Sequence, residues 1–98
     1  MSEYQITRWH QIPSLVVARQ GEHVIKIMLP TRFQEAIDEA AMRMGEIGAD
    51  AYTAGWNRDP WVDSNELPQS LADRISEELE GTFSEKYLQE ILDGLGEK

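Results

Sequence analysis

The chain has 98 residues, 41% of them hydrophobic, which is enough apolar material for one core and too little for two. It contains no cysteine, which excludes disulfide bonds, thiolate metal sites and cysteine nucleophiles. No run approaches the roughly 20 apolar residues of a membrane helix, and the N-terminal stretch lacks the apolar core of a signal peptide. We therefore expect a single soluble domain in the cytoplasm.

The formal net charge is -9, and the acidic residues concentrate in the second half. Residues 1–49 carry six acids and five bases, whereas residues 50–98 carry twelve acids and four bases. A negative field repels phosphate backbones, and the few Lys and Arg residues are scattered, so we expect no nucleic-acid partner. The acidic half is interpreted as a solubilising surface, with recognition of a basic partner protein as the alternative.

Three β-forming segments are predicted before residue 30. Residues 4–10 show the partial alternation of a strand exposed on one side. Pro13 interrupts the pattern because proline has no N–H for a sheet ladder, and residues 14–19 then resume it. Residues 23–29 follow a turn at Gln20-Gly21 and are almost continuously apolar. We expect this third strand to form a hairpin with the second and to lie at the centre of the sheet.

The most regular segment is an amphipathic helix predicted over residues 31–47. Thr31 and Gln34 have the spacing of a capping box at its start, and Gly45 and Gly48 supply its end. Its apolar residues recur at helical spacing and form a single stripe, comprising Phe33, Ala36, Ile37, Ala40, Ala41, Met44 and Ile47. The stripe predicts a helix that packs against the sheet.

The rest of the chain combines one irregular region with two helical patterns. Residues 51–63 mix aromatic residues with Gly, Asn, Asp and Pro, which predicts a short strand or extended segment with a turn or bulge before Trp61. A second helix ending at Gly81 is predicted by the spacing of Leu67, Leu71, Ile75 and Leu79. A third helix begins after Ser84 as its N-cap and carries a stripe of Leu88, Ile91, Leu92 and Leu95.

These elements predict an α+β fold. We expect a small antiparallel or mixed sheet of three to four strands, one central amphipathic helix packed on it, and one or two C-terminal helices. A short isolated helix is marginal in water, so the C-terminal stripe must find an apolar surface. We expect that surface on the same chain, hence a monomer, with a homodimer through this helix as the alternative.

Three sequence blocks together resemble the small bacterial family known as the virulence factor domain. They are YQITRWHQIPSLVVAR, LPTRFQEAIDEAAMRMG and GADAYTAGW. The resemblance covers about residues 4–83 and leaves residues 84–98 as a C-terminal helical extension. Some members of the family stand alone, and this chain is similar to that form, while others are joined to HEAT-like repeats in a protein called conserved virulence factor C.

The resemblance implies no catalytic residues. The resemblance also implies a link with gene neighbourhoods for folate and corrinoid one-carbon metabolism, with which stand-alone members are associated. This association implies an alternative role as an accessory subunit or small enzyme that holds a cofactor or ligand.

The sequence contains no recognisable metal-binding, nucleophile or nucleotide-binding motif. His10 and His23 are the only imidazoles and share no metal-ligand spacing, so we expect no metal site. The chain also lacks a nucleophile elbow, a P-loop and a dinucleotide fingerprint, so we expect neither catalytic residues nor a bound cofactor. The two histidines are interpreted as exposed or capping residues.

An aromatic and polar constellation is the best candidate binding surface. Tryptophan and arginine commonly anchor interfaces, and three tryptophans are more than a small core needs. The alternative is that Tyr52 and Trp56 pack on the 31–47 helix while Asp50 caps the segment after Gly48. The candidate residues are Trp9, His10, Asp50, Tyr52, Trp56, Arg58 and Trp61.

We therefore expect a non-catalytic accessory or adaptor module that binds another protein. The binding region would combine the segment from Trp56 to Trp61 with the acidic second half. A pocket that joins Trp9, His10, Tyr52 and Trp56 would instead favour the cofactor-holding alternative.

Overall fold

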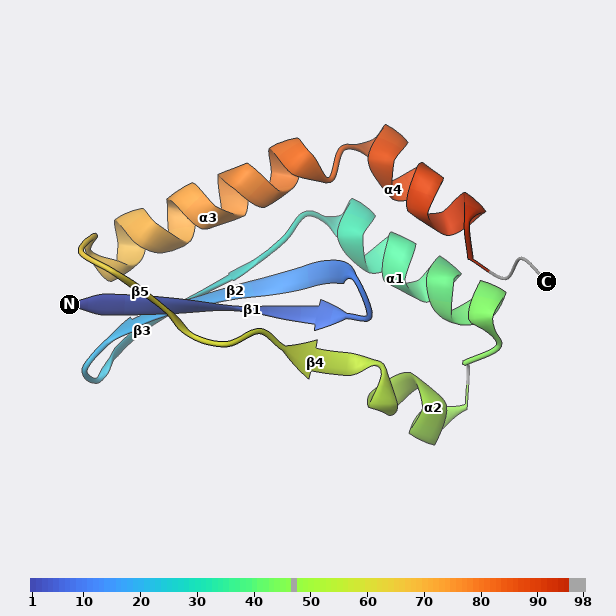
Figure 1. The fold of residues 1–98 in the computed structure, drawn as a ribbon, viewed down its shortest axis with the longest axis horizontal. Coiled ribbons are helices and arrows are strands. Elements are labelled where there is room, and N and C mark those ends of the chain that lie inside the picture. The colour runs from blue at the N-terminus through green and yellow to red at the C-terminus, as the bar shows by residue number, and fades with distance from the viewer. Residues whose placement is uncertain (47, 96–98) are drawn as a thin grey trace.

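The computed structural model describes residues 1–46 and 48–95 and has an α+β fold (Figure 1). Ile47, which the sequence analysis placed at the end of the 31–47 helix, lies outside the described residues. The elements in chain order are β1 (Ser2–Trp9), β2 (Ile12–Gln20), β3 (His23–Met28), α1 (Thr31–Met44), α2 (Ala49–Ala54), β4 (Trp56–Arg58), β5 (Val62–Ser64), α3 (Pro68–Thr82) and α4 (Glu85–Asp93). The predicted fold class is confirmed, with five strands in place of three or four.

All strand pairs in the sheet are antiparallel, and the order is β3-β2-β1-β4. β5 pairs with the start of β1, on the same edge where β4 pairs with its end. The predicted hairpin of β2 and β3 is confirmed, with Gly21 at φ 61° in its turn. The prediction that residues 23–29 lie at the centre is wrong. β3 is an edge strand, because β4 and β5 return after α1 and extend the sheet beside β1 instead.

The segment 51–63 also differs from its prediction. It begins inside the short helix α2 and continues as the two short strands β4 and β5, with Trp61 between them. The expectation of an extended region with a turn before Trp61 is therefore correct only from residue 56 onward.

An irregularity in the β1–β2 pairing decides which side chains reach the core. The register shifts between Thr7 and Arg8, and Pro13 lies inside β2 at this point instead of interrupting the strand as predicted. Such a shift breaks the alternation of side chains and tolerates a residue without an N–H. As a result Ile6 and Trp9 are both buried although they are three residues apart.

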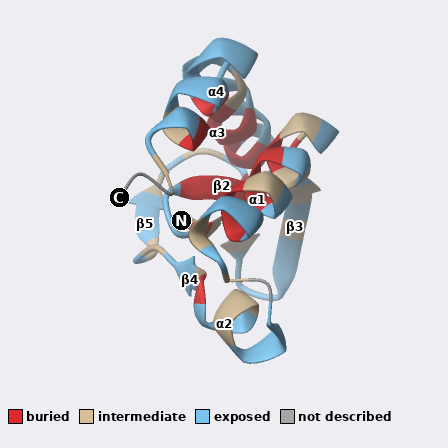
Figure 2. Cartoon of the chain, turned by 90° about the vertical axis from the view of Figure 1, so that its right-hand side faces the viewer, coloured by how far each residue is buried: buried red, intermediate tan, exposed pale blue. Residues whose placement is uncertain are grey.

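The helices α1, α3 and α4 lie on one side of the sheet, and the core fills the space between (Figures 1 and 2). α3 packs across β1, β2 and β3, while α1 packs on β2 and against α4. The predicted stripes are largely confirmed, because their members in the core cluster include Phe33, Ile37, Leu71, Ile75, Leu88 and Leu92. Leu67 is the exception, since it precedes α3 and is 67% exposed.

The helix ends differ in detail from the expected ones. Pro30 is the N-cap residue of α1 and the predicted capping box does not form, because Thr31 is already the first helical residue. Gly45 ends the helix in the left-handed conformation at φ 75°, as its position indicated. α3 continues through Gly81 to Thr82, one residue beyond the predicted end. The Ser84 cap of α4 is confirmed, with its hydroxyl accepting from the Tyr87 N–H at 3.2 Å.

The apolar stripe of α4 is covered by the chain's own α1. Leu88 and Leu92 are buried there, and Ile91 is partly buried against the same core. The oligomeric state stays a prediction. Within the described residues no helix combines the length and the apolar character needed to cross a bilayer.

Candidate protein-binding surface

The helices α1, α3 and α4 cover one face of the sheet and leave the other face open (Figure 2). Cross-strand pairs place Gln5, Val17 and Lys26 in one row on that side. Thr7, Leu15 and Met28 form the neighbouring row. We call this surface the open face, and its members are Glu3, Gln5, Thr7, Leu15, Val17, Arg19, Val24, Lys26, Met28, Arg58 and Trp61.

Two adjoining hollows mark the middle of the open face. One has a volume of about 210 Å³ and is lined by Gln5, Thr7, Leu15, Val17, Lys26 and Arg58. The other has a volume of about 500 Å³ and is lined by Thr7, Trp56, Asn57 and Arg58. Because Thr7 and Arg58 belong to both, Arg58 stands between the strand surface and the indole of Trp56.

Two cations on this surface differ from most others in the chain. Four arginines of the chain form ion pairs with carboxylates, namely Arg8, Arg43, Arg74 and, on the open face itself, Arg19. Among the described residues Lys26 and Arg58 have no carboxylate within ion-pair distance, and both line the smaller hollow. Their charges are therefore available to a ligand or partner.

Trp61 is held against the open face from the segment between β4 and β5. The guanidinium carbon of Arg19 lies 3.7 Å from the centre of its ring, which is a cation–π contact. Arg19 also pairs with Glu3 at 2.6 Å. Trp61 is half-buried, so one part of the indole is fixed by Arg19 while the rest faces solvent.

Trp9, which the sequence analysis assigned to the binding surface, lies in the hydrophobic core. Its side chain is 0% exposed, and its indole N–H donates to the carbonyl of Tyr52 at 2.8 Å. Gly55 lies so close that an added Cβ would come within 2.4 Å of the Trp9 Nε1 atom. Placing Trp9 on an exposed surface was therefore wrong, because the register shift in β1 turns it into the core.

The remaining predicted residues form a second group around Trp9. Tyr52 stacks on Trp9 with ring centres 5.6 Å apart, and Trp56 meets Tyr52 edge-on at 6.0 Å. Both are half-buried, and the Tyr52 hydroxyl accepts from Gln34 of α1 at 3.4 Å. Of the alternative in which Tyr52 and Trp56 both pack on the 31–47 helix, the structure shows the contact of Tyr52 with Gln34, whereas Trp56 lines a hollow on the open face.

His10 and Asp50 lie at the edge of this second group. His10 is exposed, has a positive φ of 53°, and its Nε2 lies 3.0 Å from the Glu46 carboxylate. Asp50 is exposed in the first turn of α2 and does not cap it, because Gly48 occupies the N-cap position without a side-chain bond. The proposed capping role of Asp50 was therefore wrong.

The pocket that would favour a bound cofactor is divided. A hollow of about 340 Å³ is lined by Trp9, His10, Gln11, Ile12, Ala40, Met44 and Leu95. Trp56 lines a different hollow on the open face, and Tyr52 lines neither. Among the described residues, no cluster of three or more His, Asp or Glu side chains could hold a metal ion.

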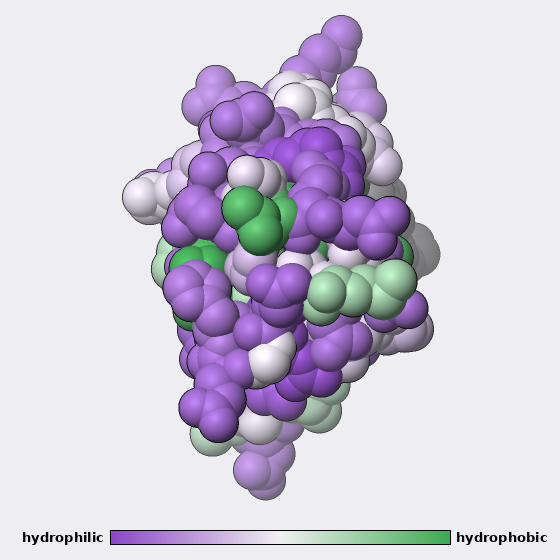
Figure 3. Space-filling model, turned by 90° about the vertical axis from the view of Figure 1, so that its left-hand side faces the viewer, coloured by the Kyte–Doolittle hydropathy of each residue, from purple (hydrophilic) through white to green (hydrophobic). Residues whose placement is uncertain are grey.

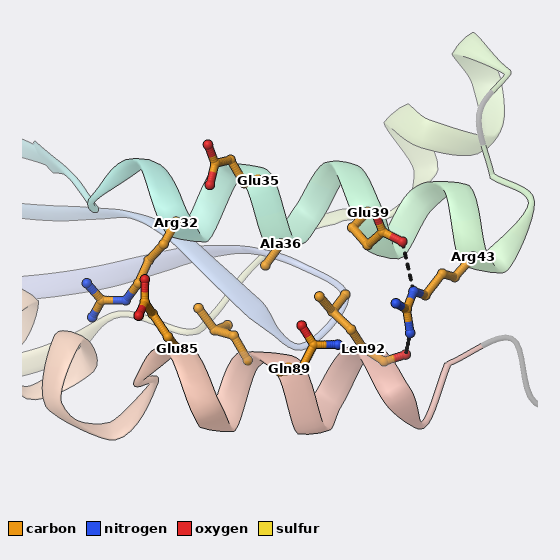
Figure 4. A pocket seen from close by; sticks show the side chains of 9 residues that line it. Arg32, Glu35, Ala36, Glu39, Arg43, Glu85, Gln89 and Leu92 are labelled. Atoms are coloured by element: carbon orange, nitrogen blue, oxygen red, sulfur yellow. Dashed lines mark hydrogen bonds and ion pairs between the residues drawn. The ribbon is translucent and has the colours of Figure 1, made fainter.

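The groove between α1 and α4 has a volume of about 470 Å³ (Figure 4). Its two arginines form hydrogen bonds within the chain and so stabilise the fold. Arg32 donates to the carbonyls of Glu80 and Phe83 at 2.9 and 3.3 Å, at the end of α3. Arg43 donates to the carbonyl of Leu92 at 2.8 Å, at the end of α4. Both arginines donate to carbonyls at helix ends, where the helix supplies few partners, although the Leu92 carbonyl also accepts from the Leu95 N–H at 3.1 Å. They fasten the two C-terminal helices to α1.

More than half of the acids in the second half of the chain lie on the opposite side of the sheet from the aromatic segment with which the sequence analysis combined them. Seven acids of the second half belong to the helices on the covered face, namely Asp73, Glu77, Glu78, Glu80, Glu85, Glu90 and Asp93. Trp61 and Arg58 lie on the open face. The end of the molecule that holds the N-terminus is mostly hydrophilic and shows separated hydrophobic side chains without a continuous patch (Figure 3).

Sequence reasoning missed most of the open face. Gln5, Thr7, Leu15 and Val17 join it only through the β1–β2 register. The alternation of Val24, Lys26 and Met28 with two isoleucines was the available signal for β3, since it predicts two unlike faces. The continuous apolar character of that strand hid the alternation.

No curated protein and no solved structure gives a significant match to this chain. The family model described as virulence factor matches residues 7–92, from within β1 to the last turn of α4. The match runs past residue 83, where the resemblance in sequence was expected to end. Whether residues 84–98 form a separate extension stays a prediction. Since the match spans most of the sequence, the chain belongs to the virulence factor family.

Proposed function

We propose that this chain is a non-catalytic adaptor module that binds another protein through the open face of its sheet. The observation that carries the proposal is the mixture of exposed apolar groups and available cations on that face. Met28 is 68% exposed and Val24 48% exposed, and Lys26 lies between them. Arg58 lies on β4 at the other edge of the sheet, and Trp61 stacks on Arg19, the cross-strand neighbour of Val24.

The composition of the open face is unusual for a surface that only meets water. A solvated face of an antiparallel sheet normally carries polar residues at alternating positions. Here Leu15, Val17, Val24 and Met28 occupy such positions on β2 and β3. Methionine, tryptophan and arginine are enriched at protein interfaces, and all three residue types are present.

The shape of the surface favours a protein over a small ligand. Ligand pockets are concave and bury most of a small molecule. The groups at issue are instead distributed over three strands and the segment before β5, as an extended partner surface requires. The cofactor alternative needs Trp9, His10, Tyr52 and Trp56 around one cavity, and the division of these residues between hollows gives it no support.

In this proposal the acidic helices do not bind the partner. Because they lie on the covered face, they keep the module soluble and repel acidic proteins from that side. The partner surface is therefore the open face alone, without the acidic helices.

Site-specific photo-crosslinking in cells tests the proposed function. A photoreactive amino acid replaces Met28 on the open face or, as the matched control, Glu77 on the exposed side of α3. We expect one discrete protein adduct from position 28 and none from position 77. The adduct should disappear when Arg58→Ala and Trp61→Ala are combined in a chain that remains folded by circular dichroism.

The opposite pattern contradicts the proposal. Adducts formed only from position 77, or adducts from position 28 that survive the double substitution, would place the interaction elsewhere.

A further inference from the structure

The outer edge of the sheet at β3 has no partner strand. Within the described residues β3 pairs only with β2, over all six positions from His23 to Met28. Figure 2 shows β3 at the margin of the sheet, with its residues mostly exposed. In an antiparallel ladder every second residue directs its N–H and C=O away from its neighbour. Such a row of free groups is a template for another strand.

The side chains along this edge specify a chemistry for the added strand. Val24, Lys26 and Met28 face the open side, and all three are exposed. Ile25 and Ile27 point toward the helices and are half-buried against the core. A strand laid beside β3 would meet an apolar, a cationic and an apolar side chain at successive alternate positions.

A lysine on an edge strand often serves only to prevent association. In this chain Lys26 also lines the hollow that contains Arg58, Gln5 and Thr7. It has no carboxylate partner among the described residues, although acids outnumber bases two to one in the whole chain. An acidic group from outside would complete this site.

A second copy of the chain fits the edge less well. Antiparallel pairing of two β3 strands about a two-fold axis at Lys26 places the two lysines directly opposite each other, and like charges so placed are destabilising. An axis at Ile25 or Ile27 sets each lysine against Val24 or Met28 and leaves its charge unpaired. A carboxylate on the added strand removes this penalty.

We infer that β3 binds an extended acidic segment of the partner by strand addition. The segment carries an acidic residue opposite Lys26 and apolar residues two positions to either side, opposite Val24 and Met28. Backbone hydrogen bonds supply the affinity, and the alternate side chains supply the selectivity. The inference rests on the proposed function and specifies how the partner uses the open face.

Two blocked peptides that differ at one position test the inference. The first, TVTETVT, carries the central acid, and the second, TVTKTVT, carries lysine instead. Each is titrated into the isotope-labelled full chain and followed by amide NMR. We expect TVTETVT to shift the amide signals of residues 23–28, to slow their hydrogen exchange, and to bind about three- to tenfold tighter than TVTKTVT.

Two variants with the same charge change separate a local effect from a global one. Lys26→Glu should reverse the order of the two peptides. Lys86→Glu alters an exposed lysine on α4 by the same charge and should leave the order unchanged. Equal binding of both peptides, signal changes outside β3, or the same effect from both variants would overturn the inference.

Light scattering on the free chain completes the test. A monomer is expected, whereas a dimer with protected β3 amides would assign the edge to a second copy and overturn the inference. The photo-crosslinking experiment separates this failure from failure of the proposed function. If the adduct from position 28 persists in the Lys26→Glu variant, the partner binds the open face without strand addition. If no adduct forms at all, the proposed function itself fails.

Discussion

The two faces of the sheet differ although they are made by the same strands. Val16 and Val17 are identical neighbours in β2, yet Val16 is 0% exposed beneath the helices and Val17 is only half-buried on the open face. The helix layer creates this difference, because hydrophobicity and strand propensity are the same at both positions. The covered face therefore carries the stability of the domain, and the open face is free to be used for binding.

The largest expected effect tests the covered face from its helix side. Ile37→Ala removes a fully buried side chain of α1 and should lower the free energy of unfolding by about 2 to 5 kcal/mol, through lost transfer energy and a residual cavity. Glu39→Ala removes only a surface ion pair with Arg43 and should cost about 1 kcal/mol or less. Chemical denaturation measures both variants. Equal small losses would contradict the assignment of the buried side of α1.

The second prediction compares the two neighbouring valines directly. Val16→Ala should cost about 1.5 to 3 kcal/mol, because the side chain is fully buried. Val17→Ala should cost about 1 kcal/mol or less, since half of its surface already meets water. The difference between their denaturation midpoints is the measurement. Matching midpoints would mean that a partner or second copy covers the open face in solution.

Local patterns predicted the helical layer well. The stripe from Phe33 to Met44, the glycine at position 45 and the Ser84 cap each depend on residues within a few positions of one another. Such signals need no knowledge of distant contacts, because the helix repeat alone brings the apolar side chains together. This is why α1, α3 and α4 agree with their predictions to within a few residues.

The sheet edges and the candidate surface could not be predicted in this way. β3 has the sequence of a central strand, and only the return of β4 and β5 to β1 makes it an edge. Trp9 looks like an exposed aromatic residue until the shift at Thr7 and Arg8 turns it inward. Both outcomes depend on strand pairing across long stretches of chain, for which a single sequence carries weak signals.

The third prediction concerns the aromatic residue of the open face. Trp61→Ala removes the cation–π contact with Arg19 and should cost about 0.5 to 1 kcal/mol at this half-exposed site. The same variant should weaken crosslinking from position 28, because Trp61 belongs to the proposed partner surface. A thermal melt and the crosslinking yield together distinguish the two roles. A loss of several kcal/mol would show that Trp61 is a core residue.

The smallest expected effect on stability concerns the ion pair that connects the sheet to the helix layer. Arg74 of α3 binds the Glu66 carboxylate with Nη2–Oε1 at 2.7 Å, and the Ser64 hydroxyl at the end of β5 also contacts it. The hydrogen bond from Arg74 is the largest of the effects that lower the pKa of Glu66 below its ordinary value of 4.5. The pair therefore joins the end of β5 to the first half of α3.

The sign of the pH dependence follows from this lowered pKa. A carboxyl group whose pKa is lower in the folded protein contributes stability above its ordinary pKa of 4.5 and loses it as the pH falls through the lowered value. Glu66→Gln removes that contribution at neutral pH. We expect the stability difference between wild type and this variant to be constant above pH 4.5 and to vanish in acid.

A matched variant on the same helix isolates the effect of the pair. Glu77 is an exposed acid of α3, and the ion pairs of the described residues do not include it. Urea unfolding at a series of pH values should therefore show a smaller acid-dependent difference for Glu77→Gln than for Glu66→Gln. Both effects are small because surface ion pairs are largely screened by water. Parallel curves for the two variants would mean that the pair between Arg74 and Glu66 does not hold β5 to the helix layer. The apolar core alone would then join the sheet to its helices.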